Sequence, residues 1–222
     1  MTIHAPDVAV TDLALAVLAA YLGWRLWTVS KNQRLLRAGA VLLGALASAA
    51  LWGASFHAFF PAGTATRMGS LAWKPVALSI VVAGATMLDL SLGLLWPRLS
   101  PHLRRSAVSI YAAGFVAVVV LLDDSFTRIV YFYVPTLALL LLAATRQVPR
   151  DRSGGWTLIL IGLLLSAGAA MLQQARVALH PVYFDHNAVY HLVQSVAVVF
   201  LYLGWRRTPD APEAASAGAA RS

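Results

Sequence analysis

Seven stretches of predominantly apolar residues follow one another along this chain, and they restrict its fold more than any other feature. A helix needs about 20 such residues to cross the hydrocarbon core of a bilayer. The connections between the stretches are short and leave no room for a soluble domain. The expected spans are 9–29, 38–60, 71–95, 107–122, 127–145, 155–178 and 187–205. The sequence therefore predicts an all-α polytopic membrane protein with seven transmembrane helices.

Composition agrees with this fold class and limits the chemistry of any site. Of the 222 residues, 59% are hydrophobic and 12% are charged, which is too apolar for a soluble domain of this length. Cysteine is absent, so a metal would need nitrogen and oxygen ligands. We expect one seven-helix domain over residues 1–207. The segment 208–222, TPDAPEAASAGAARS, has the composition of a disordered tail, expected on the cytoplasmic side.

The net charge of +8 is interpreted as a signal of orientation and not of nucleic-acid binding, because basic residues flank transmembrane spans on the cytoplasmic side. Most lysines and arginines fall at one set of span ends. Only Arg67, Lys74, Arg128 and Arg176 fall at the other. The bias predicts an N-terminus outside and a C-terminus in the cytoplasm. Arginine also outnumbers lysine and alanine is abundant, as in bacteria of high genomic GC content, so the inner (plasma) membrane of a bacterium is the expected location.

Ionisable residues gather at the outer ends of three spans. Counted at about 1.5 Å per residue, Asp12, His57 and His191 each lie about one turn inside the outer end of the first, second and seventh span. Asp12 and His57 each continue a row of small residues at helical spacing, which is typical of faces where membrane helices approach one another. Such polar groups are costly in lipid. We therefore expect them to point into the bundle.

The seventh span carries a polar face of its own. Asn187, His191, Gln194 and Ser195 recur at i, i+4, i+7 and i+8, so they share one side of a helix. His186 immediately precedes this span. On a continuous helix it would lie about 140° from His191. The two histidines can converge only if His186 stands before the regular helix.

Zinc is the metal ion that this set of side chains favours. A catalytic zinc ion typically has three protein ligands and an open position for water. His57, His186 and His191 could supply the ligands. Asp12 could be a fourth ligand, a hydrogen-bond partner of a ligand, or the acceptor of a proton.

Other acidic residues have simpler interpretations. Asp89 is an isolated carboxylate near the cytoplasmic end of the third span, where it has either a function or a hydrogen bond to a neighbouring helix. Asp123 and Asp124 are expected in a turn between the fourth and fifth spans. His180 and Asp185 are expected to be solvated or to cap a helix.

The seven-span plan, the histidine closing the second span and the histidines opening the seventh resemble the CREST superfamily. That group contains alkaline ceramidases, progestin and adipoQ receptors and lipid remodelling proteins. His57 matches the histidine of its second helix, and His191 matches the last histidine of its seventh-helix motif. Gly53 stands where the superfamily has serine, and Asn187 replaces the first histidine of its HxxxH motif, with His186 displaced by one position.

The resemblance implies a zinc-dependent hydrolase of membrane-lipid amides or esters, with three histidines and an aspartate around a metal-bound water. Asp89 is a possible counterpart of the superfamily aspartate, but Asp12 lies closer to the histidines. The alternative is a non-enzymatic seven-helix receptor, sensor or structural protein with a metal-stabilised outer site. A transporter is a weaker candidate, because no inverted repeat is visible. A retinal protein is disfavoured, since the seventh span has no lysine.

Overall fold

The computed structural model describes residues 3–31, 33–122, 125–180 and 183–208, and this part of the chain is all-α except for one isolated bridge between His180 and Phe184. The expected turn residues Asp123 and Asp124 and the expected tail beyond residue 208 lie outside the described residues. The seven long helices are α1 (Pro6–Val29), α2 (Arg34–Phe59), α3 (Arg67–Leu95), α4 (Pro101–Ala117), α5 (Phe126–Gln147), α6 (Gly155–Gln174) and α7 (His186–Arg207). A π-helical turn, η2 (Val118–Leu122), extends α4, and short 3₁₀ turns, η1 (Gly63–Ala65) and η3 (Val148–Arg150), precede α3 and follow α5.

The prediction of seven membrane-spanning helices is confirmed in length and composition. The described helices indicate an integral membrane protein. Their ends differ from the expected spans where the first turn is polar. For example, α4 begins at Pro101 and not at residue 107, because Ser100 caps it by accepting a hydrogen bond from Leu103 N–H at 3.2 Å. A count of apolar residues misses such a turn.

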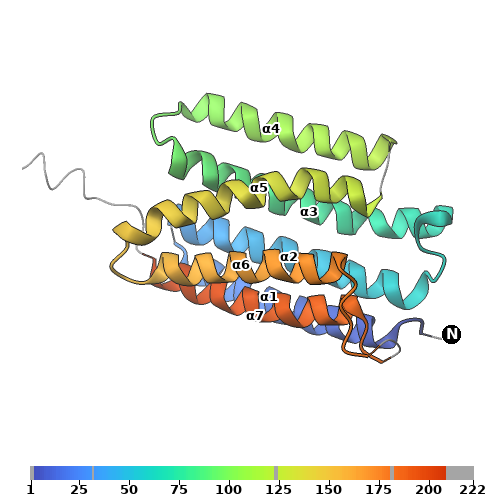
Figure 1. Cartoon of the computed structure of the whole chain (residues 1–222). Coiled ribbons are helices and arrows are strands. Elements are labelled where there is room, and N and C mark those ends of the chain that lie inside the picture. The colour runs from blue at the N-terminus through green and yellow to red at the C-terminus, as the bar shows by residue number, and fades with distance from the viewer. Residues whose placement is uncertain (1–2, 32, 123–124, 181–182, 209–222) are drawn as a thin grey trace, which may run out of the picture.

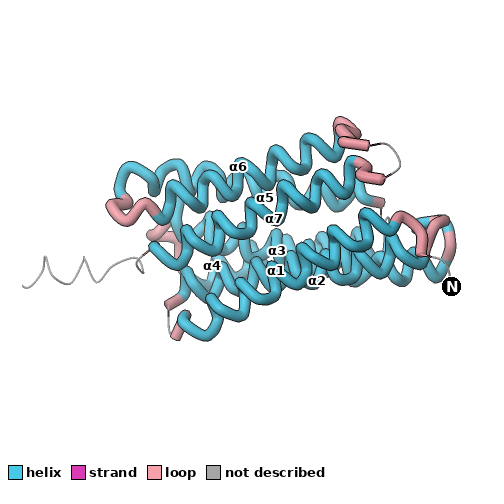
Figure 2. The backbone as a smooth tube through the Cα atoms, turned by 90° about the horizontal axis from the view of Figure 1, so that it is seen from below, coloured by secondary structure: helices cyan, strands magenta, loops and turns pink. Residues whose placement is uncertain are grey.

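The helices pack into one bundle in which the first and last helices are neighbours (Figures 1 and 2). α1 packs against α2 and α7, and α6 packs against α7 and α5. α3 packs against α2 on one side and α5 on the other. α4 packs chiefly on α3 at the edge, and Phe115 is its buried residue. The contact between α1 and α7 places residues far apart in sequence beside one another.

Glycines allow α6 and α7 to approach closely. A Cβ atom built on Gly162 would lie 2.9 Å from the carbonyl oxygen of Ala197 and 2.7 Å from Cγ of Leu201. A Cβ on Gly204 would lie 2.8 Å from the carbonyl oxygen of Gly155. Small residues at such positions let two backbones come into contact in a membrane.

We expect Gly162→Ala to destabilise the protein and Gly168→Ala, six residues further along α6, to be neutral or stabilising. The added methyl at Gly162 meets the backbone of α7, and such overpacking costs about 1–3 kcal/mol. Nothing lies within 4 Å of a Cβ at Gly168, where the higher helix propensity of alanine is worth up to about 1 kcal/mol. Thermal unfolding in detergent measures the difference. Equal melting temperatures for both variants would show that α6 and α7 are not in tight contact.

Candidate functional site

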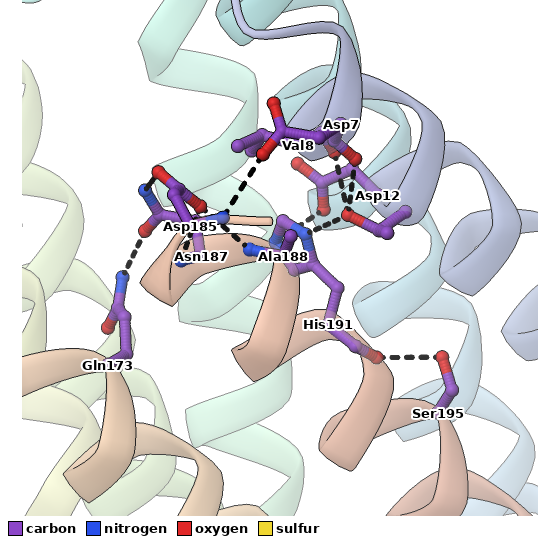
Figure 3. Close-up of polar contacts among 10 residues, drawn as sticks. Asp7, Val8, Asp12, Gln173, Asp185, Asn187, Ala188, His191 and Ser195 are labelled. Atoms are coloured by element: carbon purple, nitrogen blue, oxygen red, sulfur yellow. Dashed lines mark hydrogen bonds and ion pairs between the residues drawn. The ribbon is translucent and has the colours of Figure 1, made fainter. Parts of the chain in front are cut away.

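The centre of the candidate site is His191, on the second turn of α7. Its side chain faces α1, where both ring nitrogens have a partner. Nε2 lies 3.0 Å from Oδ1 of Asp12, and Nδ1 lies 3.0 Å from Oγ1 of Thr11. Asp12 and His191 are 4% and 5% exposed, whereas Thr11 is half-buried. Figure 3 shows the imidazole of His191 directed at the end of α1 that carries Asp12.

The second helix contributes the space that Asp12 fills. A Cβ atom on Gly53 would lie 2.7 Å from Oδ2 of Asp12, so a larger residue would collide with the carboxylate. His57 follows Gly53 by one turn and is half-buried. It is close enough to His191, Asp7 and Asp185 to interact with them electrostatically. The structure therefore brings Asp12, His57 and His191 to one end of the bundle.

The start of α7 is fixed by Asp185. Its Oδ1 accepts hydrogen bonds from Asn187 N–H at 2.8 Å and Ala188 N–H at 3.0 Å, so it is the N-cap of the helix. Its own N–H donates to Oδ2 of Asp7 at 3.2 Å (Figure 3). His186 is the first residue of α7, and its Nδ1 lies 3.7 Å from Oδ2 of Asp185. Its side chain is about one-third exposed, at 32%.

The other polar residues of α7 contact α6 or their own helix. Oδ1 of Asn187 accepts a hydrogen bond from Gln173 at 3.1 Å (Figure 3). Nε2 of Gln194 donates to Oγ of Ser166 at 3.1 Å in the buried interior. Ser195 donates to the carbonyl oxygen of His191 at 2.8 Å. The polar face of α7 is therefore divided between α1 and α6.

Asp89 lies at the other end of the bundle. Its Oδ2 is 2.6 Å from Nη2 of Arg34, which is the first residue of α2, whereas His57 lies near the last residue of that helix. At 1.5 Å per residue the two ends of α2 are about 35 Å apart. The expected hydrogen bond of Asp89 to a neighbouring helix is thus present, as an ion pair, and Asp89 is not part of the layer around His191.

The zinc site stays a prediction. Among the described residues, no three histidine, aspartate or glutamate side chains lie close enough together to hold a metal ion. In the described arrangement His191 has hydrogen-bond partners at both nitrogens and His186 is directed at Asp185. This arrangement does not fit a three-histidine metal site.

Comparison with known families assigns the chain to one of them. Residues 8–210 match DUF6962, a family of unknown function. The chain belongs to the DUF6962 family. No curated protein and no solved structure matches it. In this DUF6962 protein, Thr11, Asp12, His57 and His191 all lie inside the matched region.

The chemistry of the DUF6962 site follows from its hydrogen-bond donors and acceptors. A neutral imidazole donates from one nitrogen and accepts at the other. When Nε2–H of His191 donates to the Asp12 carboxylate, Nδ1 is left to accept the hydroxyl proton of Thr11. That hydroxyl is also 2.9 Å from the carbonyl oxygen of Asp7, which already accepts a backbone bond within α1. The hydroxyl can turn to His191 without leaving an unpaired group.

Sequence reasoning missed four members of this DUF6962 site. They are Asp7, Thr11, Ser166 and Gln173. Thr11 directly precedes Asp12, and a hydroxyl beside a predicted inward-facing carboxylate was a usable signal. The amide of Gln173 and the hydroxyl of Ser166 gave no such signal, because polar side chains of this kind also occur on lipid-facing helix ends.

Proposed function

We propose that this protein is a membrane-embedded hydrolase that cleaves an ester or amide bond of a membrane lipid. Thr11 is the nucleophile, His191 the general base and Asp12 the carboxylate that orients the imidazole. The observation that supports this role is the continuous contact from Thr11 Oγ1 to His191 Nδ1 and from His191 Nε2 to Asp12 Oδ1, at 3.0 Å each. Nucleophile–base–carboxylate sets are recognised by this geometry, whatever their order in the sequence.

In the proposed reaction the Thr11 oxygen forms a bond to the carbonyl carbon of the lipid, and its proton passes to Nδ1 of His191. The resulting imidazolium gives this proton to the leaving alcohol or amine as the old ester or amide bond breaks. Water then attacks the carbonyl carbon of the acyl–threonine ester and gives a proton to Nδ1 of His191. His191 returns this proton to the Thr11 oxygen as the ester bond breaks, which releases the fatty acid and restores the hydroxyl. Asp12 stabilises the imidazolium at each step.

The position of Thr11 on α1 supports a lipid substrate. Successive residues of a helix are about 100° apart, so Thr11 lies between the buried face with Asp12 and the opposite face with Val10. That opposite face is a shallow, widely open apolar groove lined by Val10, Leu13, Ala14, Val17, Leu18 and Tyr21. An acyl chain in this groove would lie along α1, with its carbonyl group at the level of Thr11.

Hydrolysis of a panel of lipid esters and amides by the purified protein in lipid vesicles tests the proposal. We expect release of fatty acid that persists after treatment with a chelator, because the Thr11 route needs no metal. An acyl adduct on Thr11, found by mass spectrometry of a quenched reaction, would support the covalent step. If no lipid in a broad panel is cleaved, the receptor, sensor or structural alternative becomes the better proposal.

The zinc proposal that follows from the sequence predicts a different result. If His57 and His191 are ligands, replacing either with alanine removes stoichiometric zinc from the purified protein. His102→Ala is the matched control, since His102 is exposed in the first turn of α4. Elemental analysis of the three variants decides, and equal zinc content in all of them would contradict a zinc site with these ligands.

The proposed orientation places the site at the outer surface of a bacterial inner membrane, with the N-terminus outside and the C-terminus in the cytoplasm. The asymmetry of lysine and arginine supports it. We expect a reporter fused after Arg207 to be cytoplasmic and one inserted at Thr64, in the η1 turn, to be external. If the reporter after Arg207 is external and the one at Thr64 is cytoplasmic, the site lies on the cytoplasmic side.

A further inference from the structure

The end of the bundle opposite His191 holds a cluster of charges between three helices. Asp89 of α3 lies between Arg34 of α2 and Arg104 of α4. Its Oδ2 is 2.6 Å from Nη2 of Arg34, and its Oδ1 is 3.1 Å from Nε of Arg104, the latter as an ion pair outside hydrogen-bond geometry. Two positive charges face one negative charge, which leaves a net charge of +1.

Both guanidinium groups converge on the same spot on α3. A Cβ atom on Gly93, one turn after Asp89, would lie 3.1 Å from Nη1 of Arg104 and 3.5 Å from Nη1 and Nη2 of Arg34. The missing side chain at Gly93 therefore leaves both groups beside bare backbone. A guanidinium has five N–H donors, and Asp89 engages only some of those in this pair.

The surrounding helices add to the positive potential. Arg34 is the first residue of α2, and Arg104 is in the first turn of α4. Helix N-termini carry a partial positive charge, so an arginine there is electrostatically unfavourable unless an anion is near. One carboxylate does not balance two arginines and two helix N-termini. A second anion would therefore be electrostatically favoured at this position.

We propose that Arg34 and Arg104 bind the phosphate group of an anionic phospholipid at this end of the bundle. Guanidinium groups match the geometry of phosphate oxygens, and basic sites between transmembrane helices suit anionic headgroups. Arg34 and Arg104 stand at the first turns of two helices long enough to cross a membrane, and the ends of such helices are expected near the lipid headgroups. Arg34 is half exposed, at 53%, so a headgroup can reach it. This site is independent of the proposed hydrolase, since it is at the opposite end of α2.

The test is binding of a soluble short-chain phosphatidylglycerol to the full-length protein in detergent, measured by native mass spectrometry. We expect Arg34→Gln and Arg104→Gln each to raise the Kd by about ten-fold, the usual effect of losing one charge-assisted hydrogen bond. Arg98→Gln is the matched control, because Arg98 is exposed at the same end without a contact to Asp89. Its Kd should stay within about two-fold. Equal weakening in all three variants would overturn the proposal.

Asp89→Asn should change the Kd for phosphatidylglycerol in the opposite direction. It removes the carboxylate that competes for the two guanidinium groups, so phosphatidylglycerol should bind several-fold more tightly. Weaker binding in a variant with an unchanged melting temperature would contradict the site. Two further probes identify the source of the phosphate. Phosphatidylcholine that binds as tightly as phosphatidylglycerol, or inorganic phosphate that displaces the lipid at equal concentration, would each overturn the assignment to an anionic lipid.

Discussion

Replacing Thr11 with valine is expected to lower kcat for lipid hydrolysis by a factor on the order of 10⁴, the size of effect seen when one member of a nucleophile–base–carboxylate set is removed. Valine keeps the volume of threonine and removes only the hydroxyl. The neutral hydrogen bond between the Thr11 hydroxyl and His191 contributes about 1 kcal/mol to the free energy of unfolding, so the variant should still fold. Initial rates at saturating lipid, together with the melting temperature, measure both effects.

Two variants make this result specific. Thr11→Ser keeps a hydroxyl and should retain most of the activity. Thr28→Val removes a hydroxyl from the other end of α1, where Thr28 donates to the carbonyl oxygen of Arg25, and should leave kcat unchanged. A Thr11→Val protein with full activity would refute the covalent mechanism and would indicate that water is the nucleophile.

Replacing Asp12 with alanine is expected to lower the free energy of unfolding by about 3–5 kcal/mol, the usual cost of removing one partner of a buried pair. Asp12 and His191 are both almost fully buried, and the alanine would leave Nε2 of His191 without its partner. Reversible unfolding in mixed micelles measures the loss.

A double-mutant cycle isolates the contact between the two residues. His191→Ala should be similarly destabilising, and the double variant should lose at least about 1–2 kcal/mol less than the sum of the single losses. Ser195→Ala is the control on α7, because Ser195 donates to the carbonyl oxygen of His191 in its own helix. Additive losses for Asp12 and His191 would show that the two side chains do not interact.

The fold was predictable because a bilayer leaves few alternatives: every backbone group must be paired within its own segment, so apolar stretches of this length become helices. The first turn of α4 was missed, since its polar residues are held by the Ser100 cap and not by apolarity.

Asp12 and Gly53 illustrate what could be predicted of the site. Rows of small residues indicate which face of a helix meets another helix, and the structure puts the Asp12 carboxylate against Gly53.

The partners themselves were not predictable. Spacing fixes the side of α7 on which His191 lies, but not the angle of its ring, and that angle decides whether Thr11 or a metal faces Nδ1. The ion pairs of Asp89 are made with residues of two other helices, Arg34 of α2, 55 residues before it, and Arg104 of α4, 15 residues after it. Such contacts depend on how the helices are arranged, which no local pattern contains.

The contact between α1 and α7 also has a consequence for biosynthesis. A ribosome makes α1 first and α7 last, so Asp12 enters the membrane long before His191 exists. A lone aspartate at the centre of a helix costs about 2.5–3.5 kcal/mol on insertion, and Asp12, near a helix end, carries part of that cost through the synthesis of five more helices. Its partner among the described residues, His191, arrives with α7. A nascent chain stalled before α7 therefore carries an unpaired carboxylate in its first helix, by which quality-control proteases could distinguish an unfinished molecule from a complete one.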